Sequence, residues 1–280
     1  MSTAASTRRA RSAAEALVGP FEVVADLSWR HGGAVVLDVV LAGGRRAIVK
    51  RHRLERKLAA EVHAYRSWVP ALGDRAPALL AAEEHVLVLS RIDGEPVVKP
   101  GSADEHRQAG ELLARFHASA PPAPDDGRAE RQAEQLERWV GEAPEGLLSA
   151  DEVAFARRRA GELLELPALP LVPCHADYSA RNWLVDRDGR VHVIDFERAG
   201  PAWWVHDLGR LWFREWWGRP HLRDAFLEGY GRAPTDDEVA VVERLGTIGH
   251  ITSIVWATSV GDHDFVLERR ARLDVQRGVA

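Results

Sequence analysis

The sequence has a single cysteine, no long apolar run and no excess of basic charge. The single Cys174 excludes an internal disulfide and any zinc site built from cysteines. No uninterrupted apolar run approaches the length of a membrane span, and residues 1–20 lack the apolar segment of a secretory signal. A net charge of −5 argues against the basic patch that nucleic-acid binding needs. We therefore expect a cytoplasmic monomer or homodimer with no membrane and no nucleic-acid partner.

Residues 21–50 contain apolar runs of strand length separated by turns. Gly43-Gly44 is a hairpin signal, so the segment is expected to form antiparallel strands. The earlier turn, from Ser28 to Gly33, includes Gly32. Its small residues would let backbone N–H groups approach phosphate oxygens. The turn lacks a full G-x-G-x-x-G pattern, so an ordinary hairpin turn is an equally good interpretation.

Lys50 ends one of these apolar runs, and Glu61 follows in a segment with helical periodicity. Leu58 and Tyr65 lie three and four residues from Glu61, which puts this carboxylate at or beside the apolar face of the helix. An unpaired charge in such a place is costly, so we predict an ion pair between Lys50 and Glu61. The alternative is a lysine at the surface end of a strand, with the glutamate in solvent.

The pattern becomes helical after residue 102. Three capping boxes, each a Ser or Thr followed three residues later by Glu, predict helix starts at Ser102, Ser149 and Thr235. Before them, the run HVLVL reads as a strand and continues into SRIDG. That pattern is typical of a linker between two lobes. We expect an N-terminal lobe over residues 1–89, a hinge over 90–94 and a helical C-terminal lobe over 95–280.

Polar residues gather around a predicted hairpin within residues 172–196. Two short apolar runs flank an Asp-Gly turn, which is a strong hairpin signal. Asn182 precedes the first run and Asp195 follows the second, so the hairpin brings them together. Asp177 lies in the same loop, five residues before Asn182. Oxygen ligands in this arrangement suit a divalent cation, with one carboxylate left to act as a base. A turn whose Asp and Asn only cap backbone groups is the alternative.

The spacing resembles that of the protein-kinase-like fold, in which an H-x-D-x-x-x-x-N loop is followed, after a hairpin, by a metal-binding aspartate. In this chain those positions are His175, Asp177, Asn182 and Asp195. Ala176 and Glu197 stand where protein kinases usually have Arg and Gly. These departures are similar to the aminoglycoside phosphotransferase family of small-molecule kinases. The resemblance covers nearly the whole chain from about residue 20.

The resemblance implies an α+β, bilobal protein-kinase-like fold. Its N-lobe would be a five-stranded antiparallel sheet with one helix, its C-lobe mainly helical, and ATP (or GTP) would bind between them. Asn182 and Asp195 would hold Mg²⁺. The residues implied to contact the nucleotide are Lys50 with its partner Glu61, Ser28 and Gly32 of the phosphate loop, and the backbone of Ser90 and Ile92 at the adenine edge.

The family pattern also implies roles in the catalytic loop. Asp177 would orient the acceptor hydroxyl and take its proton. Arg181 would neutralise charge on the transferring phosphoryl group, although a surface salt bridge accounts for it equally well. Asp207 is expected to be structural, accepting hydrogen bonds from the loop or capping a helix.

Two groups of residues are candidates for binding the acceptor. Trp216 and Trp217 would stack on a flat or ring-shaped group, unless they only pack within the lobe. Asp262, Asp264 and Glu268 would hold a cationic acceptor, as acidic side chains do in aminoglycoside kinases, unless they are ordinary surface acids.

The function expected from this resemblance is an O-phosphotransferase that modifies a hydroxyl of a small-molecule antibiotic and confers resistance. The first alternative is a metabolic kinase acting on an amino alcohol, a sugar or a homoserine-type hydroxyl. A nucleotide-binding protein without catalysis is the second, and the joint presence of Lys50, Asp177, Asn182 and Asp195 argues against it. Only ten residues separate Asp195 from 205–207, too few for the activation segment of a protein-substrate kinase.

Overall fold

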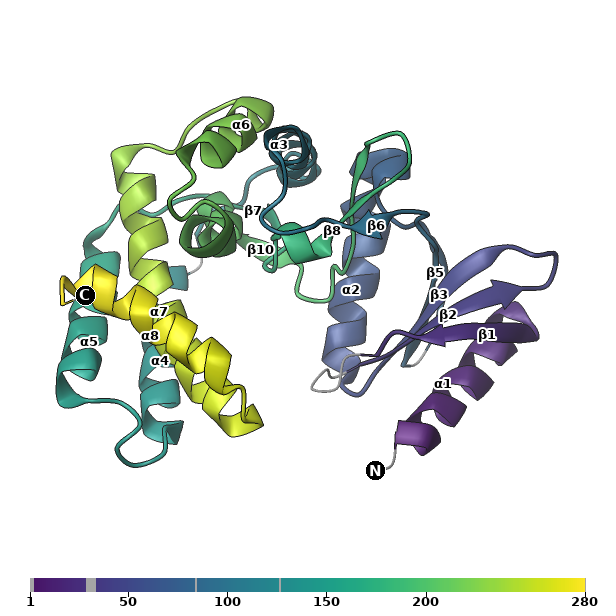
Figure 1. The fold of residues 1–280 in the computed structure, drawn as a ribbon, viewed down its shortest axis with the longest axis horizontal. Helices are drawn as coiled ribbons and strands as arrows, with labels where there is room; N and C mark the ends of the chain where they lie inside the picture. Colours follow the sequence, from purple (N-terminus) through teal and green to yellow (C-terminus); the bar gives the residue numbers. More distant parts are fainter. Residues whose placement is uncertain (1–2, 29–33, 84, 126, 280) are drawn as a thin grey trace.

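The computed structural model describes residues 3–28, 34–83, 85–125 and 127–279. It has two lobes, one built on a sheet and the other mainly helical (Figure 1). The expected α+β architecture, with an antiparallel sheet followed by helices, is confirmed. The predicted phosphate turn falls largely on residues 29–33, including Gly32, which lie outside the described residues.

The N-terminal sheet has five antiparallel strands in the order β1-β2-β3-β5-β4. The strands are β1 (Phe21–Asp26), β2 (Ala34–Leu41), β3 (Arg46–His52), β4 (Leu79–Glu83) and β5 (Val86–Ser90). The register of β3 with its two neighbours places Lys50 opposite Val36 of β2 and Leu87 of β5. Lys50 therefore lies in the middle of the sheet and close to the second lobe.

Helices cover both faces of this sheet. Alternate side chains of a strand point to opposite faces, and β5 is buried on both. Val86 and Val88 pack with the first helix, α1 (Thr3–Val18), while Leu87 and Leu89 belong to the core shared with α2 (Glu55–Ser67) and the helical lobe. The sheet lobe thus has two helices, whereas one was predicted. Ala10 and Ala14 explain the difference, because these fully buried small residues, one turn apart, let α1 lie close on the sheet.

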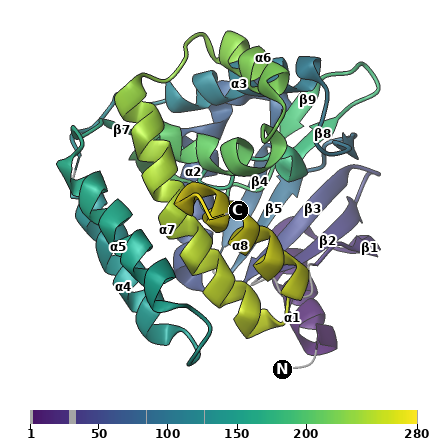
Figure 2. The same ribbon diagram turned by 60° about the vertical axis from the view of Figure 1, so that its left-hand side comes forward.

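The second lobe is built from six α-helices and short helical turns among the described residues. Its helices are α3 (Ala103–His117), α4 (Arg128–Glu142), α5 (Ala150–Glu165), α6 (Pro220–Tyr230), α7 (Asp236–Val260) and α8 (His263–Arg277). The three predicted capping boxes are present at the starts of α3, α5 and α7. Figure 2 shows α8 lying along α7 on one side of this lobe. None of the described helices is long and apolar enough to cross a membrane.

Short strands between the lobes carry the polar loop. β7 (Leu171–Cys174) pairs with β10 (Gly200–Trp203), and β8 (Trp183–Val185) pairs with β9 (Val191–Val193) as the predicted hairpin. β6 (Glu95–Pro96), which follows the expected hinge, adds to β8. The connections are the 3₁₀ turns η1 (Val69–Arg75), η2 (Ala180–Asn182) and η3 (Trp204–Leu208), and a π-helical turn, η4 (Leu211–Glu215). Loop 175–182 is therefore held at both ends by paired strands.

Candidate active site

Lys50 of the sheet lobe forms ion pairs with the second lobe. Its Nζ lies 3.1 Å from Glu61 Oε1, 2.6 Å from Asp195 Oδ1 and 3.4 Å from Glu197 Oε2. The predicted pair with Glu61 is therefore present, and Glu61 is fully buried. Burial opposes the charge of Lys50, but the three carboxylates outweigh it and raise the pKa of the lysine. The lysine is held as a cation, directed at Asp195 of the second lobe.

Two further residues complete this cluster, and sequence reasoning missed both. His52 Nε2 lies 2.6 Å from Glu61 Oε2, which fixes the second oxygen of that carboxylate. Glu197 also binds Lys57 of α2, at 3.2 Å. Both follow a predicted site residue by two positions, His52 after Lys50 and Glu197 after Asp195. Lys50 and His52 lie on β3, where that spacing places two side chains on the same face, which was the available signal for His52. Glu197 lies in the turn after Asp195, where strand periodicity gives no signal.

The backbone of the polar loop is clamped by Asp207 of η3. Asp207 Oδ2 accepts the His175 N–H at 2.7 Å, and Oδ1 accepts the Ala176 N–H at 2.6 Å. This is the structural role expected for Asp207. Ala176 has φ 59°, a left-handed conformation that is costly for a residue with a Cβ. The two hydrogen bonds hold the strained turn in place, as expected where a loop must present side chains in a fixed direction.

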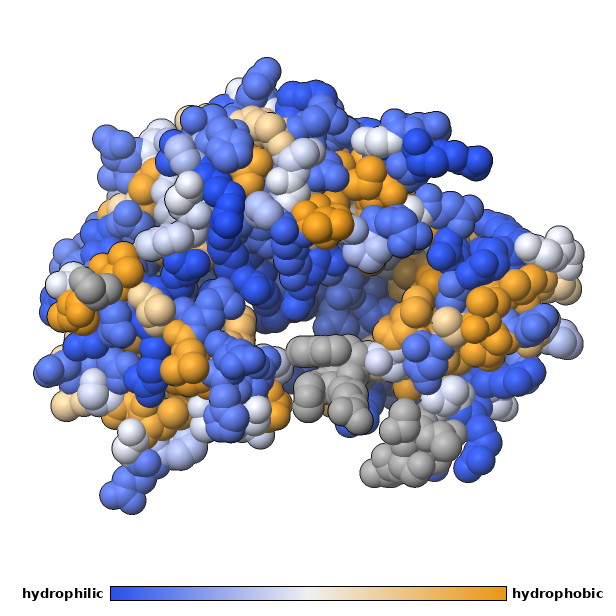
Figure 3. Space-filling view, in the orientation of Figure 1, coloured by the Kyte–Doolittle hydropathy of each residue, from blue (hydrophilic) through white to orange (hydrophobic). Residues whose placement is uncertain are grey.

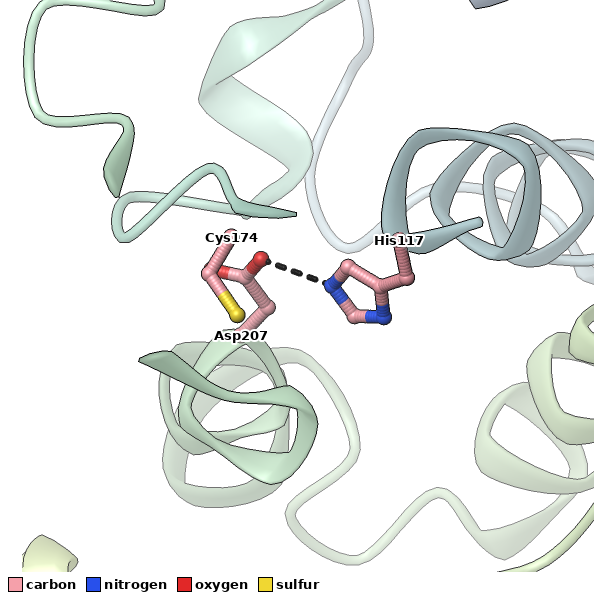
Figure 4. A group of neighbouring side chains, drawn as sticks. All are labelled: His117, Cys174 and Asp207. Atoms are coloured by element: carbon pink, nitrogen blue, oxygen red, sulfur yellow. Dashed lines mark hydrogen bonds and ion pairs between the residues drawn. The ribbon is translucent and has the colours of Figure 1, made fainter. Parts of the chain in front are cut away.

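His117, Cys174 and Asp207 lie together in the interior and resemble a metal site in composition (Figure 4). Their polar atoms already have other partners. His117 bonds Asp207 Oδ2 at 3.1 Å through Nε2 and the Tyr230 hydroxyl at 2.9 Å through Nδ1. Burial raises the pKa of the Cys174 thiol, which disfavours the thiolate that a metal would need. The group therefore supports the loop.

Replacing Asp207 with asparagine tests this clamp. One amide N–H would face a backbone N–H, so a buried donor loses its acceptor, a change worth roughly 1–3 kcal/mol. We expect a lower thermal midpoint and a lower kcat, with little change in nucleotide affinity. Asp224→Asn, on the exposed surface of α6, is the matched control. Unchanged stability and kcat in Asp207→Asn would show that the loop does not depend on the clamp.

Asp177 is almost fully buried and lies between two arginines. Its Oδ1 is 2.6 Å from Arg210 Nε, and its Oδ2 forms an ion pair with Arg181. Arg210 was missed by sequence reasoning. Arg210 follows Asp207 by three residues in a helical turn, so the two side chains lie on the same face. Asp207 binds the backbone of the loop, and Arg210 binds the carboxylate of Asp177 in the same loop. Burial lowers the pKa of Arg210 to about 10, against the attraction of Asp177. The loop therefore presents one carboxylate flanked by two cations.

Asn182 and Asp195 are brought together by the hairpin, as predicted. The Ile194 N–H donates to the Asn182 carbonyl at 3.0 Å, and Asn182 Nδ2 donates to the Asp177 carbonyl at 2.9 Å. Asp195 has φ 68°, a strained conformation of the kind that clusters at functional sites. Burial opposes ionisation of Asp195, but the Lys50 charge outweighs it and holds the pKa of this carboxyl below its usual value.

These contacts leave ligand atoms for a cation. Among the described residues, Asn182 Oδ1 and Asp195 Oδ2 have no hydrogen-bond partner. Amide and carboxylate oxygens are the donors that Mg²⁺ prefers. The residues present therefore fit Mg²⁺, and the role of Asn182 and Asp195 in holding it stays a prediction.

The residues predicted to contact the rest of the nucleotide lie along the sheet and the hinge. Ser90 ends β5, where its N–H and hydroxyl bond the backbone of Ala78. The Ile92 carbonyl accepts from Arg91, at 3.1 Å. Ser28 Oγ accepts the Val36 N–H at 2.9 Å, so this hydroxyl is used within the sheet lobe. The roles of Ser90 and Ile92 at an adenine edge stay predictions.

The candidate acceptor residues are not gathered as expected. The prediction that Trp216 lines an open pocket is wrong, because its ring is buried against Phe226 and its Nε1 donates to His106. Trp217 is 37% exposed, and the Arg272 guanidinium lies 4.3 Å from its ring centroid.

The three acidic candidates also have separate surroundings. Asp262 caps α8 by accepting the Phe265 N–H, and Asp264 is exposed in the first turn. Glu268 Oε1 lies 3.3 Å from both Arg214 and Arg269. Their role in binding a cationic acceptor stays a prediction.

This combination of fold and site is that of the protein-kinase-like phosphotransferases. The chain belongs to the phosphotransferase enzyme family, whose model matches residues 35–242. The predicted family resemblance and enzyme class are thereby confirmed. No curated protein matches the sequence.

Solved structures of antibiotic phosphotransferases share the fold. Macrolide 2'-phosphotransferase type I aligns with a TM-score of 0.64 and 18% identity over 98% of each chain. Aminoglycoside phosphotransferase APH(4)-Ia aligns with a TM-score of 0.72 and 15% identity, again over 98% of each chain. A thermostable mutant of that enzyme, in a ternary complex with AMP-PNP and hygromycin B, has a TM-score of 0.71 and 14% identity over 95% of this chain and 97% of that chain. At these identities the likeness concerns the fold.

Proposed function

We propose that this protein transfers the terminal phosphoryl group of ATP or GTP to a hydroxyl of a small molecule, in the presence of Mg²⁺. One observation carries the proposal: Lys50 of the sheet lobe lies 2.6 Å from Asp195 of the helical lobe, and Asp195 is joined through the hairpin to Asn182 and Asp177. A cation from one lobe thus faces the oxygen ligands of the other, the arrangement that phosphoryl transfer needs.

In the proposed reaction Asp177 orients the acceptor hydroxyl and takes its proton. A bond forms between the acceptor oxygen and the γ-phosphorus, the bond from that phosphorus to the β–γ bridging oxygen breaks, and ADP or GDP leaves. Arg181 and Arg210 flank Asp177 and face the charge that develops on the transferred group. Lys50, which Glu61 holds in place, binds the nucleotide phosphates. Asn182 and Asp195 would hold Mg²⁺, which would supply charge neutralisation at the phosphates.

The domain limits are part of the proposal: a sheet lobe over 1–89, a hinge over 90–94 that holds the nucleotide base through Ser90 and Ile92, and an acceptor-binding lobe over 95–280. The single link between the lobes supports them, because the sheet ends with β5 and the next strand, β6, pairs with β8 of the second lobe. We further propose that the enzyme acts in the cytoplasm, where ATP is available, as a monomer or homodimer.

Two acceptor classes are proposed. Modification of an antibiotic hydroxyl, with resistance as its consequence, is supported by the antibiotic phosphotransferases that share the fold. A metabolic alcohol is supported by the acidic candidates, since Asp262 caps a helix and Glu268 is already bound by two arginines. Glu268 is therefore not available as a free carboxylate for a polycation.

The test is a coupled ADP-release assay with Mg²⁺, ATP or GTP and a panel of acceptors. The panel combines aminoglycosides, macrolides, cyclic peptide and nucleoside antibiotics with metabolic alcohols, and mass spectrometry identifies the phosphorylated product. We expect release that depends on both Mg²⁺ and acceptor, and that EDTA abolishes. A protein that neither hydrolyses nor transfers phosphate, and that Mg·AMP-PNP does not stabilise against heat, would contradict the proposal.

A further inference from the structure

A series of arginines lies between Asp177 and α8. Arg210 binds Asp177, and Arg214 lies one turn further along the same stretch, with its Nε 3.3 Å from Glu268 of α8. Arg269 binds the same oxygen of Glu268 at 3.3 Å. Arg272, one turn further on α8, stacks on Trp217. Together with Arg181, we call these residues, Arg181, Arg210, Arg214, Arg269 and Arg272, the arginine cluster.

The carboxylates within reach are too few to neutralise the arginine cluster. Asp177 is shared by Arg181 and Arg210, and Glu268 by Arg214 and Arg269. Arg272 has no ion pair with any residue that the structure describes. Glu215 lies nearby, and burial raises the pKa of its carboxyl. Even when Glu215 is counted, three carboxylates face the five guanidinium groups of the cluster. A local positive excess results, in a chain whose net charge is −5.

The guanidinium groups are held in place, but some of their N–H donors have no hydrogen-bond partner among the described residues. Arg269 is 6% exposed and packs over the Phe265 ring, 4.5 Å from its centroid. Its Nε and that of Arg272 are buried without a hydrogen-bond partner among the described residues. A buried, partly satisfied guanidinium is costly, and burial with the neighbouring arginines lowers the pKa of Arg269 to about 10. An incoming anion would relieve this cost.

The nucleotide does not account for the whole cluster. Arg181 and Arg210 lie at Asp177, where the phosphoryl group would arrive, but Arg269 and Arg272 are on α8, which packs along α7 in the helical lobe. Lys50, the cation on the nucleotide side, contacts Glu61, Asp195 and Glu197 instead. In Figure 1, α8 (yellow) runs across the helical lobe from its N-terminal end, which lies nearer the sheet lobe, to the C-terminus on the far side, and Figure 3 shows a hollow between the lobes with largely hydrophilic walls.

We propose that Arg214, Arg269 and Arg272 bind an oxyanion of the acceptor, and that the acceptor is an alcohol bearing a carboxylate or a phosphate ester. The inference rests on the proposed function and names its substrate class. The guanidinium fork pairs with planar or tetrahedral oxyanions through parallel N–H donors. A polycationic acceptor would be repelled by the same groups. An anion on α8 would leave the acceptor hydroxyl free to reach Asp177.

A binding experiment tests the oxyanion site without knowledge of the acceptor. The protein is saturated with Mg·AMP-PNP, so that the nucleotide site is filled, and titrated with inorganic phosphate or with succinate at constant ionic strength. We expect a saturable rise in the thermal midpoint with at least one probe, and the two probes distinguish a phosphate ester from a carboxylate. A rise that does not saturate, or no rise with either probe, would overturn the proposal.

Single variants locate the site. Arg272→Gln and Arg214→Gln should each weaken binding of the responding probe about tenfold or more, since a hydrogen bond to a charged group is lost. Arg223→Gln on α6 is the matched control, because it removes the same charge from an exposed position paired only with Asp224. Equal binding by Arg272→Gln, Arg214→Gln and the control would place the anion elsewhere and overturn the assignment.

Acceptors of similar size but different charge provide the kinetic test. Glucuronate, glucose and glucosamine differ mainly in charge, and we expect kcat/KM to fall in that order, with the preference for glucuronate reduced in Arg272→Gln. A preference for glucosamine would overturn the anionic assignment while leaving the phosphotransferase intact. If none of the three is phosphorylated, the probe titration decides. If Mg·AMP-PNP did not stabilise the wild-type protein against heat, that result would instead count against the proposed function itself.

Discussion

Asp177→Asn is expected to reduce turnover by about 10²–10⁴-fold, the range typical of a lost general base. The amide keeps the size of the side chain but cannot take a proton from an acceptor hydroxyl. Nucleotide affinity should change little, because Lys50, Asn182 and Asp195 are untouched. The measurements are kcat for acceptor phosphorylation, and the Kd of Mg·AMP-PNP from a thermal or calorimetric titration.

Loss of charge near the loop needs its own control. Asp188→Asn, in the exposed hairpin turn that follows the loop, removes one carboxylate without touching the arginines. It should leave both kcat and Kd at the wild-type values. Asp177 would be excluded as the base if Asp177→Asn retained near-normal phosphorylation.

Asp195→Asn should affect binding first. Asp195 both approaches Lys50 at 2.6 Å and carries a free oxygen suited to Mg²⁺. Removing its charge is expected to weaken Mg²⁺-dependent nucleotide binding about tenfold or more, equivalent to the ~1.5–3 kcal/mol of a contact with a charged group. Nucleotide titrations with and without Mg²⁺ separate the two roles, since the Mg²⁺-dependent gain in affinity should shrink.

Asp188→Asn again serves as the control, because it carries the same chemical change outside the Lys50 cluster. The variant Asn182→Asp adds a second check, as it keeps an oxygen ligand and should retain Mg²⁺ dependence. If wild type and Asp195→Asn gained equally from Mg²⁺, Asp195 would not hold the cation.

Local signals were sufficient for most of the framework. The Asp-Gly turn of the hairpin and the three capping boxes each depend on residues a few positions apart, and all formed as expected. The pairing of Lys50 with Glu61 was also foreseeable, since two charges displaced toward apolar surroundings need each other. The family pattern then predicted which of these residues would contact the nucleotide.

Residues whose partners lie far away in the sequence were harder to assign. Trp216 was a candidate for stacking on the acceptor, yet it packs within the lobe, where its indole N–H reaches His106, more than one hundred positions earlier. Arg210 reads as one more helix charge until the clamp of Asp207 turns it toward Asp177. Glu268 reads as a ligand for a cation until Arg214 and Arg269 are seen to bind it.

The sequence by itself determined most of the elements, the turn that folds Asp195 back beside Asn182, and the family. Only the tertiary structure decided which side chains remain free to act. Short-range chemistry, such as capping, turn geometry and periodicity, is written in neighbouring residues. The balance of charge in a site is set by groups that meet only after the chain has packed, as Lys50 meets Asp195 and Arg214 meets Glu268.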